Sequence, residues 1–236
     1  MKRKLTILLA VMMLLALLLS ACQKTATAVP LMTDPNEILK KSFETTKTMK
    51  SAKVAIDISV SAQGLNMVFT GEGAVKMPDQ SYMKMKVMGQ EYEMLMLSKD
   101  EVYVRTAADK PFTKVDSSQM NQVGTNPDFL SQQVKMLELY ENPKLIGVEK
   151  LDGVDTYHIS FTMDLQKVMN MTGQQLPPEA KDMKGNAEAE AWITTADLYQ
   201  VKSVIKMDYV FQSVAAKLEM TMTMKDINQP VDLPKP

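Results

Sequence analysis

Alternation of apolar and polar residues is the dominant pattern in the chain after residue 50. Val54, Ile56, Ile58 and Val60 alternate with polar or small residues, the period of a half-buried β-strand. Turn signals such as Asp152-Gly153 separate similar segments at short intervals. The segments expected to be strands are 53–60, 67–75, 83–87, 92–97, 101–105, 145–151, 157–163, 187–194, 201–209 and 210–225. The pattern predicts an antiparallel sheet of about ten or eleven strands.

Helical patterns interrupt the strands in two places. Asp34 as N-cap and Pro35 at the first helical position predict a helix over 35–49. A second apolar stripe predicts a helix that begins at Asn126-Pro127 and ends at Asn142-Pro143, and Asp164 is expected to cap a short third helix. Because the helices do not alternate regularly with strands, the class is α+β. We expect a curved, incompletely closed half-barrel with two or three helices over its concave face, and Gly71 and Gly73 suggest a bend or bulge in the sheet.

The N-terminus has the pattern of a bacterial lipoprotein signal. Lys2, Arg3 and Lys4 precede an apolar run over 5–19, and Leu19-Ser20-Ala21-Cys22 reads as a lipobox. The alternative is a transmembrane helix, but the run is shorter than the ~20 residues that a span requires. We therefore expect a signal peptide over 1–21, a lipidated tether over 22–33 and one domain over 34–236. Acyl chains on Cys22 would anchor the protein to the extracytoplasmic face of the cell membrane.

Composition narrows the possible partners. Without the three basic residues of the signal, 24 basic and 28 acidic residues remain, a net charge of −4. This balance, with Arg105 as the single remaining arginine, gives no basic surface for nucleic acid. Of 22 methionines, 19 follow the lipobox. Methionine is a common core filler and also lines surfaces that accept varied apolar partners, so both interpretations stay open. The oligomeric state does not follow from the sequence.

Residues suited to catalysis or cofactor binding are few. His158, the single histidine, falls on the polar side of its strand and is expected to be an exposed surface residue. Glu188 and Glu190 share a strand face, which is more typical of a solvated charged surface than of a glycosidase pair. Met220, Met222 and Met224 are ~6.6 Å apart along one strand, too far to chelate one copper ion together. We expect no enzyme activity, no cofactor and no metal.

A set of apolar residues is instead expected to line a cavity between sheet and helices. All of its members lie on apolar sides of predicted strands or of the first helix. They are Leu39, Phe43, Ile56, Ile58, Met83, Met85, Ile159, Phe161, Leu218, Met220 and Met222.

Several segments resemble the LppX/LprG-type lipoproteins and, more distantly, the LolA/LolB lipoprotein carriers. They are ILKKSFETTK at 38–47 with MKSA at 49–52, GVDTYHI at 153–159, AWI at 191–193 and DINQPV at 226–231. The resemblance implies a half-barrel of about eleven antiparallel strands wrapped on helices, an apolar cavity between them, and binding or transfer of acylated lipids at the cell envelope. The Met-rich apolar faces depart from this group, and no residue pattern marks a particular lipid headgroup.

Two functions remain in view. The first is a lipoprotein that binds or carries acylated lipid, or a lipoprotein ligand, in that cavity. The second is a surface-tethered protein-interaction or sensor domain with a filled core. Both need the same fold, and they differ in whether the interior is open.

Overall fold

The computed structural model describes residues 31–87, 89–98, 100–116, 139–167, 184–211 and 214–236. From Met32 onward the chain forms one compact unit. It contains one long helix among the described residues, α2 (Pro35–Lys47), and eleven strands. The strands are β1 (Ser51–Ala62), β2 (Leu65–Lys76), β3 (Gln80–Val87), β4 (Gln90–Ser98), β5 (Glu101–Arg105), β6 (Thr113–Val115), β7 (Tyr140–Leu151), β8 (Val154–Met163), β9 (Lys184–Thr194), β10 (Gln200–Phe211) and β11 (Val214–Lys225).

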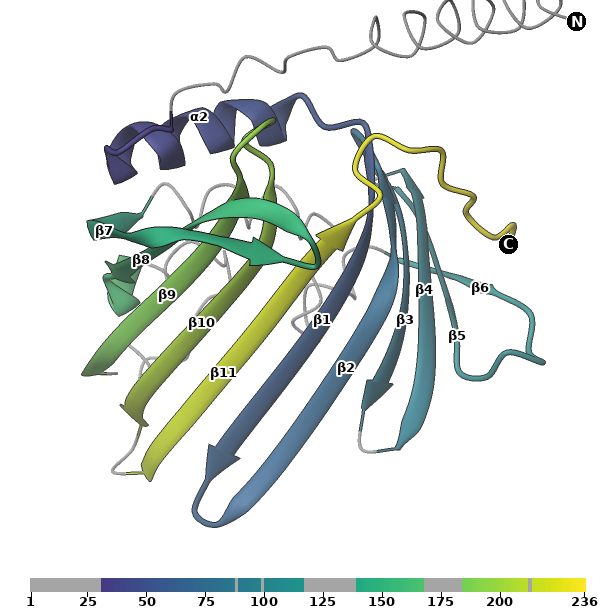
Figure 1. The fold of residues 1–236 in the computed structure, drawn as a ribbon. Helices are drawn as coiled ribbons and strands as arrows, with labels where there is room; N and C mark the ends of the chain where they lie inside the picture. Colours follow the sequence, from purple (N-terminus) through teal and green to yellow (C-terminus); the bar gives the residue numbers. More distant parts are fainter. Residues whose placement is uncertain (1–30, 88, 99, 117–138, 168–183, 212–213) are drawn as a thin grey trace, which may run out of the picture. The chain divides into compact units, whose positions relative to one another are not determined.

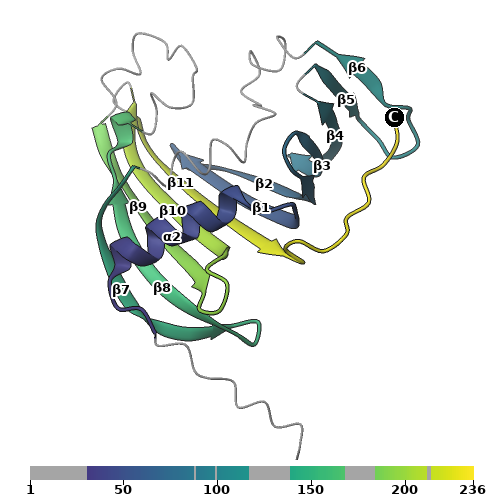
Figure 2. The ribbon, with the colours of Figure 1, turned by 90° about the horizontal axis from the view of Figure 1, so that it is seen from above.

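All eleven strands belong to a single antiparallel sheet. Their order is β6-β5-β4-β3-β2-β1-β11-β10-β9-β8-β7, so two meanders are joined by the pairing of β1 with β11. The sheet is not closed, because β6 and β7 are its two edges. It is strongly curved, and α2 lies on its concave side over the β7–β11 part (Figures 1 and 2). The expected large antiparallel, incompletely closed sheet is confirmed.

Helix α2 begins as the sequence predicts. The Asp34 side chain accepts a hydrogen bond from the backbone N–H of Asn36 at 2.9 Å, and Pro35 occupies the first turn. The helix ends at Lys47, two residues before the predicted end, and Met49 is buried beyond it. Its buried face carries Ile38, Leu39 and Phe43. This amphipathic pattern directs the helix onto the sheet.

The second predicted helix falls mostly on 117–138, outside the described residues. Its predicted C-terminal end is wrong, because β7 already begins at Tyr140 and contains both Asn142 and Pro143. Pro143 is tolerated because β7 is an edge strand with a register irregularity between Glu141 and Lys144. Of the predicted third helix, residues 165–167 are helical, and Asp164 caps them by accepting from the backbone N–H of Lys167 at 3.1 Å.

Gly71 and Gly73 permit a bend rather than a bulge. The β2–β3 register runs without a shift from Phe69 to Lys76. A Cβ atom on Gly73 would lie only 1.9 Å from the backbone oxygen of Tyr82, so the two strands approach more closely there than any side chain would allow. Figure 2 shows the sheet turning sharply beside β3.

Candidate functional site: the curved apolar face

The strand register traces one apolar face across the sheet. Ile58 of β1 lies opposite Met220 of β11, which lies opposite Ile205 of β10. The same face continues through Ala189 of β9 to Phe161 of β8. In the other direction it passes through the two β2 glycines to Met83 and Met85 of β3 and on to Met94 and Met96 of β4. One continuous face therefore spans both meanders.

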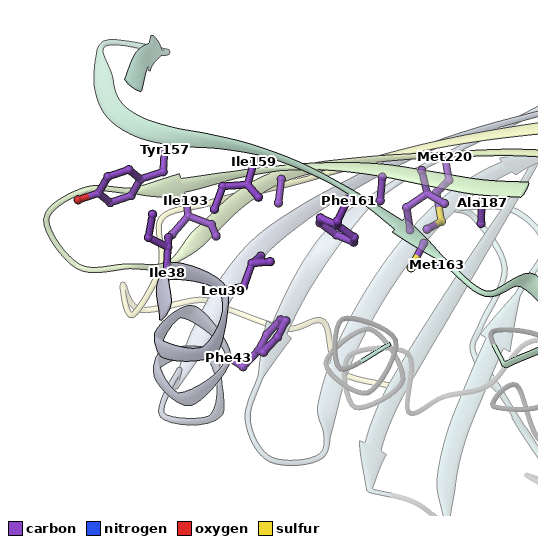
Figure 3. Close-up of a cluster of buried hydrophobic side chains, with 13 residues drawn as sticks. Ile38, Leu39, Phe43, Tyr157, Ile159, Phe161, Met163, Ala187, Ile193 and Met220 are labelled. Atoms are coloured by element: carbon purple, nitrogen blue, oxygen red, sulfur yellow. The ribbon is translucent and has the colours of Figure 1, made fainter. Parts of the chain in front are cut away.

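Helix α2 covers one half of this face and packs it closely. In Figure 3, Ile38, Leu39 and Phe43 point from the helix toward β8 and β9. Leu39 and Ile159 are fully buried in this cluster. The small residues Ala187, Ala189 and Ala191 of β9 give the facing side chains room. We refer to this region, from β7 to β11 with α2, as the covered half.

Aromatic contacts extend the covered half to the sheet edge. The ring of Phe43 lies 6.0 Å from that of Tyr140, and Tyr140 lies 6.3 Å from Phe161 in an edge-to-face arrangement. These contacts tie α2 to β7 and β8. Just before the N-terminal end of α2, Met32 donates its backbone N–H to the buried Tyr157 hydroxyl at 2.8 Å. The chain is thus held to the sheet just before the helix begins.

The other half of the face is less buried. Apart from the buried Val54 and Val75, the large apolar side chains on the concave side of β1, β2 and β3 keep part of their surface exposed. Members of this open half are Ile56, Ile58, Val60, Phe69, Met83, Met85 and Val87. A smaller buried cluster of Met94, Met96 and Val102 borders the open half, and Met85 packs against this cluster. The open half is the part of the sheet suited to contact with an apolar ligand.

The residues expected to line a cavity differ in how far they are buried. Six are buried and belong to packed clusters: Leu39, Phe43, Ile159, Phe161, Met220 and Met222. Five are half-buried: Ile56, Ile58, Met83, Met85 and Leu218. All of the strand residues face the concave side, and whether they line one cavity stays a prediction. Sequence parity places a residue on a face and does not tell how far a helix covers it.

An open hollow of about 420 Å³ lies at the end of the β1–β2 hairpin and of β9–β11. Apolar residues such as Ala62 and Tyr209 line it together with the charged Asp208 and Lys217. The neighbouring hairpin exposes Leu65 and Met67 to solvent. The apolar character of the face therefore continues to the end of the strands.

His158 lies on the opposite, convex face, where it is less exposed than expected. Its side chain is 15% exposed, because the imidazole stacks on Trp192 with ring centroids 4.3 Å apart. Nε2 lies 2.8 Å from a Glu190 oxygen and Nδ1 lies 3.4 Å from Glu149, which also accepts the indole N–H of Trp192. Lys202 lies over the Trp192 ring. Both imidazole nitrogens face carboxylates, an arrangement that does not present the ring as a base to a serine hydroxyl.

A second polar cluster on the convex face was not predicted. Glu93 is 3% exposed, and its Oε2 accepts hydrogen bonds from Arg105 and from the Tyr82 hydroxyl, both at 2.6 Å. Arg105 also lies over the Phe112 ring. A signal was present in the sequence: Glu93 interrupts an apolar run, and the short β4–β5 connection brings it opposite Arg105.

The pKa values in this cluster reflect its burial and pairing. Burial, with the hydrogen bond to Glu93, raises the pKa of Tyr82 to about 12. For Glu93, burial alone would raise the pKa, but the hydrogen bonds from Arg105 and Tyr82 and the charges of Arg105 and Lys84 outweigh it, so the pKa is lowered. The carboxylate therefore stays ionised inside the protein. These properties are those of a structural ion pair.

The part of the chain that the structure describes was searched for metal-ligand clusters and for membrane-spanning helices. Within them, no three His, Cys, Asp or Glu side chains gather as they would around a metal ion. In the same part of the chain, no helix has the length and apolar character needed to cross a membrane. Cys22, the predicted lipidation site, lies outside the described residues.

Comparisons with known proteins agree with this architecture. LppX from Mycobacterium tuberculosis matches with a TM-score of 0.55 at 18% identity, covering 85% of this chain and 100% of LppX. LprF from Mycobacterium bovis matches with a TM-score of 0.58 at 18% identity, covering 86% and 98%. A LolA-superfamily protein from Nitrosomonas europaea is more distant, at 13% identity and a TM-score of 0.30, covering 86% of this chain and 96% of its own.

The search of curated protein sequences gives no match. The family model of the LppX_LprAFG lipoproteins matches residues 34–233, nearly the whole of the compact unit. This range includes α2, all eleven strands and both halves of the apolar face. The chain belongs to the LppX_LprAFG lipoprotein family.

Proposed function

We propose that this protein is a membrane-anchored, extracytoplasmic lipoprotein without enzyme activity that binds or carries acylated lipid. The observation that carries the proposal is the continuous concave apolar face, of which only one half is covered by α2. Each methylene removed from water contributes about 0.8 kcal/mol, so an acyl chain laid along the open half gains substantial free energy. Ile56, Ile58, Met83, Met85 and Leu218 are the lining residues assigned to this site.

The six buried residues of the original set have a different part in this proposal. Leu39, Phe43, Ile159, Phe161, Met220 and Met222 belong to packed clusters that support the sheet beside the ligand site. Methionine suits the exposed side of such a site, because its unbranched, polarizable side chain adapts to apolar partners of varied shape. Met83 and Met85 on β3 are the half-buried methionines that illustrate this best.

Anchoring is assigned to Cys22 by the lipobox that precedes it. Replacement by alanine should abolish acylation and leave the chain uncleaved at this site. Metabolic labelling with a clickable fatty acid measures this directly. Undiminished label on Cys22→Ala would contradict the anchor while leaving the lipid-binding face to be tested separately.

A second candidate is a tethered protein-interaction or sensor domain. The close packing of the covered half favours it, since Leu39 and Ile159 are fully buried in one apolar cluster there. This function requires the open half to contact a protein instead of a lipid.

Extraction of the purified mature lipoprotein distinguishes the two candidates. Native mass spectrometry before and after organic extraction should reveal an acylated lipid that leaves with the solvent. The Met85→Trp variant fills part of the proposed site and should therefore retain less lipid than the wild type. Wild-type protein that yields no lipid and binds no fluorescent lipid would overturn the proposal in favour of the interaction domain.

A further inference from the structure

The tip of the β1–β2 hairpin carries exposed apolar side chains on both of its faces. Leu65, Met67 and Val68 are 73%, 40% and 51% exposed. Successive residues of a strand point to opposite faces, so Leu65 and Met67 lie on the concave side and Val68 lies on the convex side. A protein laid against the sheet covers only one of these faces, whereas a bilayer surface that receives the tip covers both. Exposed apolar residues gathered in this way mark an interaction site.

The hairpin projects beyond a neighbouring strand. Its strands pair without a shift up to Ala62 opposite Leu65, and Gln63 and Gly64 form the tight two-residue turn, both with positive φ. The last pair between β2 and β3 joins Phe69 to Val87, so residues 65–68 extend past the end of that pairing. Figure 1 shows the tip at the opposite end of the strands from α2. The apolar tip is therefore a short, tightly turned and accessible projection.

The charges around the tip set how deeply it can enter an apolar medium. Residues 58–71 contain no charged side chain, so this segment enters the boundary of a bilayer without the cost of burying a charge. Lys217 is the register partner of Ser61 and pairs with Asp208 at 3.4 Å. Both side chains are largely exposed, and they would remain among the lipid headgroups. Because this pair has no net charge, the tip requires no anionic lipid.

The proposed anchor keeps a bilayer within reach of the tip. The ten residues from Cys22 to Leu31 span at most ~33–36 Å. The twelve residues of β1 extend over ~40 Å, a comparable distance. A domain that lies lengthwise along the membrane can therefore place the tip on the same bilayer that holds the acyl chains.

We propose, on the basis of the lipoprotein function proposed above, that the hairpin tip over residues 62–68 inserts into the surface of the anchoring bilayer. The open half of the apolar face begins directly behind this tip. Val60 pairs with Met67, and Ile58 pairs with Phe69 one step farther along the hairpin. A lipid that leaves the bilayer at the tip meets these side chains first. The tip thus connects the membrane to the proposed lipid-binding surface.

The test restores the anchor chemically. Cys22 is the single cysteine of the chain, so protein expressed without residues 1–21 can be coupled through its thiol to a maleimide-headgroup lipid in phosphatidylcholine vesicles. The Leu65→Trp variant reports on the tip through its fluorescence in excess of the wild type, which contains Trp192. Insertion into the headgroup–acyl boundary should lower this excess about twofold when the lipid acyl chains are brominated, because bromine quenches indole fluorescence on contact.

Ile146→Trp is the matched control, because Ile146 is 59% exposed but lies on the edge strand β7. Its excess fluorescence should be almost the same in both kinds of vesicle. Circular dichroism verifies that each variant is folded, and Val68→Trp replaces Leu65→Trp if that variant fails to fold. The proposal is overturned if the tip variant is quenched no more than the control. It is also overturned if its emission shifts to shorter wavelength as protein concentration rises without vesicles, since the tip then contacts a second copy.

This experiment can fail independently of the proposed function. The coupling through Cys22 does not require acylation in the cell, and quenching at the tip does not require a lipid bound to the open half. Fatty-acid labelling tests the anchor, and lipid extraction tests the binding face.

Discussion

Met83 is paired with Gly73 in the β2–β3 register, but its terminal methyl group lies over Gly71. The two glycines therefore do different things. Gly73 lets backbones approach, since a Cβ there would overlap the carbonyl oxygen of Tyr82 at 1.9 Å. Gly71 makes room for flexible methionine side chains. The curvature of the sheet therefore depends on Gly73, and the shape of the open half depends on Gly71.

This difference predicts unequal effects of the same substitution. Gly73→Ala should destabilise the protein by at least the ~1–3 kcal/mol typical of overpacking, because backbone must move. Gly71→Ala meets the end of a flexible side chain at 3.3 Å and should cost less than ~1 kcal/mol. Urea denaturation of the two variants measures both values. Equal losses would contradict the assignment of the bend to Gly73.

The hydrogen bond from Met32 to Tyr157 predicts a link between the start of α2 and the sheet. Tyr157→Phe removes the buried acceptor and should cost ~1 kcal/mol. Tyr199→Phe is the control, because it removes a hydroxyl that accepts an exposed hydrogen bond from Asn228. Its expected effect on the free energy of unfolding is much smaller. A Tyr157→Phe variant as stable as the control would show that the contact does not hold the chain.

The buried pair of Glu93 and Arg105 predicts a large effect on stability. Arg105→Met leaves the Glu93 carboxylate, whose side chain is 4% exposed, without its cation and should clearly destabilise the protein. Lys150→Met breaks the exposed pair with Asp155 and should cost ~0–1 kcal/mol. Thermal and urea denaturation should rank the variants in this order, and a small loss for Arg105→Met would contradict a structural role.

The same cluster predicts loss of stability at high pH. The pKa of Tyr82 is raised from its ordinary value of 10.0 to about 12, so the folded state favours the neutral phenol. That contribution is fully present below pH 10 and is lost as the pH rises toward 12. Tyr82→Phe should remove this part of the alkaline loss. If wild type and variant lose stability in parallel over this range, Tyr82 is not the group responsible.

Local sequence signals were sufficient for much of the fold. The Asp34-Pro35 cap fixed the start of α2, and the two-residue period identified most strands and their inward-facing residues. The strand β6 does not follow from the sequence pattern, because three residues are too few to show a period. The Asn142-Pro143 pair was misread as a helix end because proline also suits an irregular edge strand, and the sequence does not reveal which strand is the edge.

Contacts between distant strands were less predictable. His158 was correctly assigned to the polar face of its strand, but its stacking on Trp192 depends on the β8–β9 register. The division of the apolar face into covered and open halves depends on where α2 lies, which its own amphipathic pattern does not specify. For that reason the sequence places Ile159 and Met85 on one face but does not show that the first is fully buried and the second half-buried.

The most direct test of the open half compares Met85→Trp with Ala191→Leu. Met85 is half-buried, whereas Ala191 is fully buried beneath α2. If the open half accepts acyl chains, Met85→Trp should cost less than the ~1–3 kcal/mol of an overpacked core and should reduce fluorescent-lipid uptake, while Ala191→Leu should cost at least that much. Denaturant midpoints and lipid titrations on the same samples give both quantities. A strongly destabilised Met85→Trp variant, together with wild-type protein that binds no lipid, would contradict the lipid-binding account.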